Sequence, residues 1–264
     1  QITVSGAKNV VLKALVAACL TDERVIIENI PFISDLMIMA DIIKHLGGEV
    51  RFGDHVISVK VKDIKTDMID LETAAEIRTS FMFLAPLLAR KKSAVIPNPG
   101  GCRIGARPID RIVKGFQKMN VSIKYHSKDG YFHANTTGLI GANYRFPKNT
   151  HTGTETLILA AVLAKGRTVL QNAAEEPEID ELIGFLNNAK IQVVEMVKNS
   201  IKKVFLSVLT GIIFAGIFSF GIYVFAIPPI SPYSPGYTLD PNCAPGTTNC
   251  TVTMPVPYTG ATNT

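Results

Sequence analysis

The chain has 264 residues, with 27 Lys and Arg against 22 Asp and Glu, a formal net charge of +5 and 47% hydrophobic residues. Its basic residues are scattered and no aromatic residues alternate with them, so nucleic acid is not an expected partner. The length allows one large domain or two small ones. The mean hydropathy of +0.24 is high for a soluble enzyme, and one segment near the C-terminus accounts for the excess.

Long apolar segments predict helices that share one interior. They cover roughly residues 7–20, 74–90 and 153–164. Apolar side chains occupy nearly every position of these segments, as expected for helices that are covered on most sides. Cys19, in the first of them, is expected to be a buried structural residue.

Between these helices the sequence repeats one plan of a short strand, a turn, an amphipathic helix and a second strand. Three segments show it: residues 20–50, 87–123 and 163–193. Asn29 matches Asn172, and Asp35 matches Glu178, while the apolar positions keep register. The pattern predicts an α/β fold of three similar sheet-plus-helix units packed about a pseudo-threefold axis.

The middle segment carries a loop that is rich in proline and glycine, residues 97–111, with one thiol, Cys102. Three arginines surround it in sequence: Arg103, Arg107 and Arg111. Pro108 suits the first turn of a following helix. A thiol beside guanidiniums and a helix N-terminus ionises easily, and the same charges suit a phosphate or carboxylate ligand. The alternative is a surface turn with a bystander cysteine.

Residues 204–227 form an uncharged apolar run that is long enough to cross a bilayer as one helix. Lysines stand directly before it, at 198, 202 and 203, and no Lys or Arg follows it. The positive-inside rule therefore predicts residues 1–200 in the cytoplasm and the tail outside. A buried core helix is the alternative.

The tail, residues 228–264, is rich in Pro, Gly and Thr and is expected to be largely irregular, with Cys243 and Cys250 able to form a local disulfide. The repeat pattern stops near residue 194, and a basic linker, residues 195–203, follows. This linker either leads into an anchor helix or marks a join of two unrelated coding segments near residues 190–196.

Four motifs resemble one family, the UDP-N-acetylglucosamine enolpyruvyl transferases: SGAKN (5–9), LTDERVIIENIPFISD (20–35), PGGCRIGARPID (99–110) and NAAEEPEI (172–179). The likeness covers residues 1 to about 193. It implies a domain of three βαβαββ-like units that faces a second domain across the active-site cleft. It also implies transfer of the enolpyruvyl group of phosphoenolpyruvate to the 3′-hydroxyl of UDP-N-acetylglucosamine in peptidoglycan precursor synthesis. No cofactor and no metal are expected, and the oligomeric state is open.

The resemblance also implies roles for particular residues. Cys102 matches the cysteine that acts as general acid and forms an adduct with phosphoenolpyruvate, and Lys8 and Asn9 match a pair that contacts phosphoenolpyruvate and the sugar. Arg78 and Arg107 match arginines of the substrate site. A run of five residues matches the segment that lines the nucleotide-sugar site: Arg107, Pro108, Ile109, Asp110 and Arg111.

Departures from the family pattern weaken some of these roles. Where relatives read Ser-Val-Gly-Ala-Thr, residues 151–155 read His-Thr-Gly-Thr-Glu. Only Gly153 is kept, and His151 and Thr152 are candidates for the sugar-phosphate segment by position alone. Ile112 stands where bacterial relatives often have histidine. The family's second domain, with its aspartate base and closing arginines, has no counterpart beyond residue 194, so the chain alone is expected to show little transferase activity.

Two alternatives remain from the sequence. The chain could be an inert product of fusion or misassembly, with membrane anchoring as its only intact function. It could also resemble the related transferase that acts on shikimate 3-phosphate, although that family lacks a cysteine acid in the loop.

Overall fold

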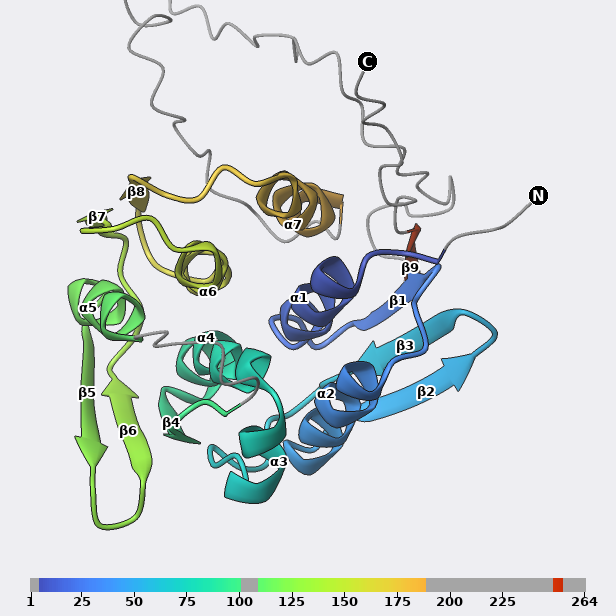
Figure 1. The fold of residues 1–264 in the computed structure, drawn as a ribbon, viewed down its shortest axis with the longest axis horizontal. Coiled ribbons are helices and arrows are strands. Elements are labelled where there is room, and N and C mark those ends of the chain that lie inside the picture. Colours follow the sequence, from blue (N-terminus) through green and yellow to red (C-terminus); the bar gives the residue numbers. More distant parts are fainter. Residues whose placement is uncertain (1–4, 101–108, 189–248, 254–264) are drawn as a thin grey trace, which may run out of the picture.

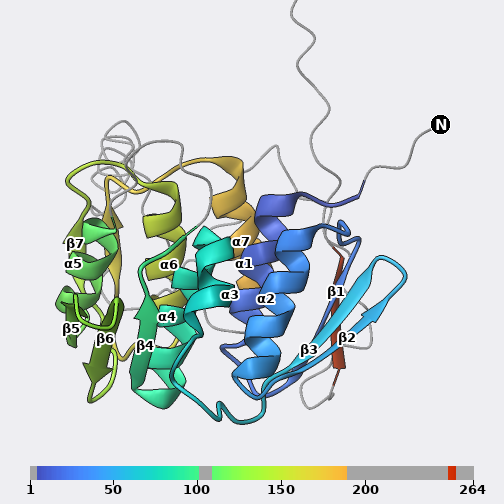
Figure 2. The same ribbon diagram turned by 60° about the horizontal axis from the view of Figure 1, so that its bottom comes forward.

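The structure, a computed structural model, describes residues 5–100, 109–188 and 249–253 (Figures 1 and 2). The helical segments are α1 (Lys8–Ala18), α2 (Ser34–His45), α3 (Leu71–Glu76), η1 (Arg78–Phe83), α4 (Leu84–Pro86), η2 (Leu87–Lys91), α5 (Asp110–Lys118), α6 (His151–Ala161) and α7 (Pro177–Asn188). The strands are β1 (Arg24–Glu28), β2 (Glu49–Gly53), β3 (Val56–Lys60), β4 (Ser93–Pro97), β5 (Val121–His126), β6 (Tyr131–Thr136), β7 (Asn143–Arg145), β8 (Val169–Gln171) and β9 (Asn249–Thr253).

Three small sheets surround a group of central helices (Figure 1). The first has the order β2-β3-β1-β9, in which β3 is antiparallel to both of its neighbours and β9 is parallel to β1. The second, β4-β6-β5, is antiparallel throughout, and the third pairs β7 with β8 in parallel. The α/β fold of three sheet-plus-helix units agrees with the prediction from the repeats.

The internal repeat extends to backbone detail. Asn29 follows β1 with φ 56° and Asn172 follows β8 with φ 51°, so both occupy the left-handed region that asparagine tolerates better than most residues. Asp35 and Glu178 are each the second residue of their helix, α2 and α7. The matches found in the sequence therefore mark equivalent positions in two units.

The predicted shared interior is confirmed, because all three segments contribute side chains to the buried core. Every residue from Val10 to Ala18 in α1 is buried, and so is every residue from Gly153 to Ala161 in α6. The prediction of one helix over residues 74–90 is wrong. That stretch ends α3 and continues through η1, α4 and η2, because Ile77 adopts an extended conformation (φ −136°, ψ 130°) that interrupts helical bonding.

The predicted membrane run (204–227), the basic linker (195–203) and Cys243 lie outside the described residues. Within the described ranges, no helix has the length and apolar character that crossing a bilayer requires. Within the tail that is predicted to be largely irregular, residues 249–253 form the short strand β9, which runs parallel to β1. A strand can hydrogen-bond to β1 only from the same side of a bilayer, so this pairing disagrees with the prediction that the tail lies outside.

Candidate functional site

The described candidate residues all lie at the beginnings of helices. Lys8 and Asn9 open α1, Arg78 opens η1, Ile109, Asp110 and Arg111 open α5, and Thr152 and Gly153 lie in the first turn of α6. Their common position matters because the first N–H groups of a helix have no partner within it and carry a partial positive charge. Such positions suit anionic ligands when several of them share one face.

Contacts between side chains show that these beginnings do share one end of the domain. Lys8 forms an ion pair with Asp35, at 2.8 Å, which joins the starts of α1 and α2. Lys13, the sixth residue of α1, lies 3.1 Å from Glu155, the fifth residue of α6. This contact packs α1 against α6, and Figure 2 shows that both helices begin at the same end of the domain.

The helix α5 joins this arrangement through a close contact with α6. A methyl group added at Gly115, the sixth residue of α5, would lie 2.3 Å from Cδ1 of Leu157, the seventh residue of α6. The start of α7 belongs to the same end, because His151 Nε2 lies 4.0 Å from a carboxylate oxygen of Glu178. Lys8, Arg111 and the N-termini of several helices therefore lie at one surface, which we call the helix-start face.

Both residues that flank the cysteine loop lie close to these elements. Gly100 packs directly on the backbone of Ala75, since a methyl group there would lie 1.8 Å from the Ala75 carbonyl oxygen. Arg78 begins η1 three residues after Ala75. At the other side of the loop, Ile109 is the N-cap residue of α5. Cys102, Arg103, Arg107 and Pro108 lie outside the described residues, so their roles stay predictions.

The described candidate residues differ in their exposure to solvent and in their hydrogen bonds. Lys8 is 53% exposed although it pairs with Asp35, and Asn9 and Asp110 are exposed. Arg78 is half-buried. The carbonyl of Arg111 accepts a hydrogen bond from the Tyr144 hydroxyl at 2.8 Å, which ties the start of α5 to β7. Several of the predicted side chains are thus accessible to a ligand.

The start of α6 is less open than the sequence suggested. Thr150 caps this helix, and its hydroxyl oxygen accepts the N–H of Gly153 at 3.3 Å. Gly153 is buried, and an added methyl group would lie 2.5 Å from Cγ2 of Thr150. The glycine therefore serves the cap itself, and its amide is already engaged. The carbonyl of Thr152 accepts the Thr156 hydroxyl at 2.7 Å.

Sequence reasoning missed an ionisable cluster directly beneath the helix-start face. Glu155 is fully buried and Lys13 is 7% exposed, and His151 Nδ1 lies 3.6 Å from Glu155 Oε2. Burial raises the pKa of Glu155 to about 7, an effect that Lys13 partly opposes. Burial and the nearby Lys13 charge lower the pKa of His151. A signal was present, since Lys13 and Glu155 are charged residues within segments that are predicted to form the shared interior.

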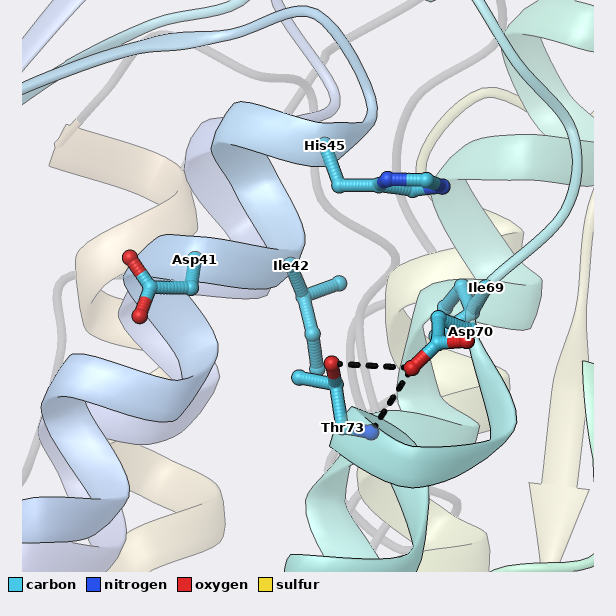
Figure 3. A pocket seen from close by; sticks show the side chains of 6 residues that line it. All are labelled: Asp41, Ile42, His45, Ile69, Asp70 and Thr73. Atoms are coloured by element: carbon cyan, nitrogen blue, oxygen red, sulfur yellow. Dashed lines mark hydrogen bonds between the residues drawn. The ribbon is translucent and has the colours of Figure 1, made fainter.

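A hollow of about 230 Å³ between α2 and α3 is separate from these residues (Figure 3). It is lined by Asp41, Ile42, His45, Ile69, Asp70 and Thr73, none of which was predicted as a site residue. Both carboxylates already serve helices. Asp70 caps α3 by accepting the Thr73 N–H at 3.0 Å, which lowers its pKa, and Asp41 pairs with Lys44 at 2.8 Å.

Comparison with known proteins identifies the family of the domain. Residues 1–204 match the family described as EPSP synthase (3-phosphoshikimate 1-carboxyvinyltransferase). The chain belongs to this family. A UDP-N-acetylglucosamine 1-carboxyvinyltransferase from Acidobacterium capsulatum is 41% identical over 196 residues, which cover 73% of this chain and 44% of that protein. Another, from Carboxydothermus hydrogenoformans, is 42% identical over 187 residues, covering 71% and 44%.

Solved structures of the family share the fold. The enolpyruvyl transferase NikO from Streptomyces tendae superposes with a TM-score of 0.61 at 18% identity, over 70% of this chain and 43% of its own. An EPSP synthase from Acinetobacter baumannii gives 0.55 at 16% identity, over 68% and 42%. The predicted resemblance is confirmed. The EPSP synthase-family chain spans about 44% of the length of the curated relatives that it matches.

Proposed function

We propose that this chain provides one domain of a transferase that moves the enolpyruvyl group of phosphoenolpyruvate to the 3′-hydroxyl of UDP-N-acetylglucosamine. The observation that carries the proposal is the helix-start face. There, α1 (with Lys8), η1 (with Arg78) and α5 (after the cysteine loop) each pack against α6, and Gly100, before the loop, packs on Ala75. Relatives with 41% and 42% identity carry the name of that activity, which favours it over transfer to 3-phosphoshikimate. We propose the cytoplasm as the place where residues 1–200 act.

The chemistry of phosphoenolpyruvate fits these side chains. The substrate carries a phosphate and a carboxylate, which the proposed arginines, Arg78 and Arg107, bind through paired N–H donors. Lys8 adds a compact positive charge after it separates from Asp35, and its 53% exposure permits that movement. The N-termini of α1 and α5 contribute further N–H groups to the helix-start face.

In the proposed reaction the Cys102 thiol gives its proton to the methylene carbon of phosphoenolpyruvate. The adjacent carbon then has oxocarbenium character, and the 3′-hydroxyl oxygen of the sugar attacks it as that hydroxyl loses its proton. Loss of phosphate, together with one proton from the new methyl group, regenerates the carbon–carbon double bond. A placed acid of this kind supplies about 100- to 10,000-fold in rate. The start of α5 (Ile109, Asp110 and Arg111) is the proposed contact for the nucleotide sugar, with Thr152 of α6 beside it, while Gly153 shapes the cap of that helix.

Ligand binding tests the proposal most directly, because turnover by this chain is expected to be low. In saturation-transfer NMR on the 264-residue chain, we expect UDP-N-acetylglucosamine to bind and shikimate 3-phosphate not to bind. Arg111→Ala should weaken binding of UDP-N-acetylglucosamine, and Arg78→Ala that of phosphoenolpyruvate, each about tenfold, since charged hydrogen bonds contribute about 1.5–3 kcal/mol. Lys44→Ala is the matched control, because Lys44 is exposed on α2 and pairs with Asp41 at 2.8 Å, away from the proposed site residues. Preference for shikimate 3-phosphate would contradict the assignment.

Phosphate release measures how much of the reaction this chain performs. With phosphoenolpyruvate and UDP-N-acetylglucosamine, we expect residues 1–264 to reach less than about 1% of the turnover of a full-length relative. The resemblance assigns the general base, an aspartate, to the family's second domain, and a placed base alone contributes at least ~100-fold. Turnover close to that of the Acidobacterium capsulatum relative would show that residues 1–264 suffice.

A further inference from the structure

The hairpin of β5 and β6 brings together two imidazoles and a carboxylate that the proposed function does not use. His126 ends β5, Asp129 lies in the connecting turn, and His133 lies in β6. One potential ligand atom from each of the three lies within 4.8 Å of the other two. The register places His126 opposite Tyr131, so His126 and His133 occupy diagonal positions on one face of the hairpin.

The turn holds the carboxylate in a defined place. Gly130 adopts φ +81° and donates its N–H to the His126 carbonyl at 2.9 Å, which closes the turn. Asp129 Oδ1 accepts the Tyr131 N–H at 2.9 Å, and Oδ2 lies 2.8 Å from His133 Nε2. These two hydrogen bonds fix the orientation of the Asp129 carboxylate relative to the hairpin.

We propose that His126, Asp129 and His133 bind a zinc ion, with water in the fourth position. Two imidazole nitrogens and a carboxylate oxygen form a donor set typical of zinc sites that keep one open position. The second carboxylate oxygen, held by the Tyr131 amide, supplies the outer hydrogen bond that orients a metal-binding carboxylate. The site is a property of the hairpin and does not depend on the transferase activity.

The required movement is small. Tetrahedral ligands at about 2.0–2.2 Å from zinc are about 3.3–3.5 Å apart. The Asp129–His133 pair is already closer than this, at 2.8 Å, and the stacked rings of His126 and His133 have centroids 4.1 Å apart. His126 is exposed, so rotation of its ring can turn a nitrogen toward the other two donors. Zinc takes the place of the proton between His133 and Asp129, and that proton passes to water.

Titration with zinc sulfate, followed by calorimetry, tests the site. The full chain should first be alkylated with iodoacetamide, because accessible thiols would also bind zinc. We expect one equivalent of zinc to bind, and His126→Ala, His133→Ala and Asp129→Asn each to weaken binding at least tenfold. His45→Ala is the control, since His45 lies in α2 and should leave binding unchanged.

A second measurement guards against misfolded variants. In ¹⁵N-edited spectra of the unchanged chain, substoichiometric zinc should shift the imidazole signals of His126 and His133 and leave that of His55 in place. Binding that survives the double substitution His126→Ala/His133→Ala would overturn the proposal. Equal shifts of all imidazoles, or a dissociation constant above about 1 mM, would overturn it as well.

Discussion

Glu155 lies in the interior, 3.1 Å from the ammonium group of Lys13, and this environment makes its protonation matter for stability. Its pKa is raised to about 7 in the folded chain, above the usual value near 4.5. Between those two pH values the folded state holds a proton that the unfolded state releases. The free energy of unfolding that Glu155 contributes should therefore fall as the pH rises from about 4.5 to 7.

We expect the difference in unfolding free energy between the unchanged chain and Glu155→Gln to shift by about 3 kcal/mol over this range, in favour of the variant at the higher pH. Urea denaturation at pH 5 and pH 8 measures it. The opposite pH trend of His151, whose pKa is lowered, is present in both proteins and cancels to first order. Glu23→Gln, at an exposed position, should show no such shift. An equal difference at both pH values would show that Glu155 stays ionised.

Cys19 provides a second test at the residue scale. Its side chain is 1% exposed, and burial raises its pKa to about 12 despite the nearby Arg90 charge. We expect iodoacetamide to leave Cys19 unmodified in the folded chain at pH 8. Cys102, which three arginines surround in sequence, is expected to react. Peptide mapping with and without urea provides the measurement, and Cys19 should react only in urea. Equal labelling of both thiols without urea would contradict the prediction.

Among the elements, the guanidinium of Arg90 joins three segments that are distant in sequence. It donates to the carbonyls of Cys19 (2.9 Å) and Thr21 (3.0 Å) after α1, and to those of Val61 and Lys62 (both 2.8 Å) after β3. A lysine cannot reach all four acceptors with one ammonium group.

Arg90→Lys should therefore lower the free energy of unfolding by about 2 kcal/mol, as expected for loss of charged hydrogen bonds to partly buried carbonyls. Thermal or urea unfolding provides the measurement. Arg51→Lys is the matched control. Arg51 is 75% exposed, and its ion pair with Glu49 is long, at 3.9 Å, so a change within about 0.5 kcal/mol is expected there. A similar loss in both variants would show that the carbonyl contacts do not matter.

The contact between α5 and α6 depends on the missing side chain at Gly115. A methyl group there would overlap fully buried Leu157, so Gly115→Ala should cost about 1–3 kcal/mol even though alanine favours helices. In the Leu157→Ala background the same substitution should cost less, or stabilise, because the new methyl group then has space. A double-mutant cycle measures this coupling, and additive effects would rule out the contact.

At the scale of the whole molecule, the sequence and the structure place the C-terminal tail differently. A membrane helix at 204–227 would place residues 249–253 across the bilayer from β1, whereas the structure pairs them as neighbouring strands. With β9 in the first sheet, a reporter fused after Thr264 should be active in the cytoplasm when the chain is expressed in bacteria. Activity confined to the outer face would instead support the membrane helix and show that β9 does not pair with β1 in that state.

The sequence by itself determined the three-unit α/β plan, the equivalence of Asn29 with Asn172, and the family. These properties depend on local patterns, since apolar periodicity, turn residues and short motifs are readable within a few dozen positions. Only the tertiary structure decided that the helix starts share one face, that Lys13 meets Glu155, and that residues 74–90 break into four segments. Such features depend on which distant surfaces pack together, and burial of a charge depends on its neighbours in space rather than in sequence.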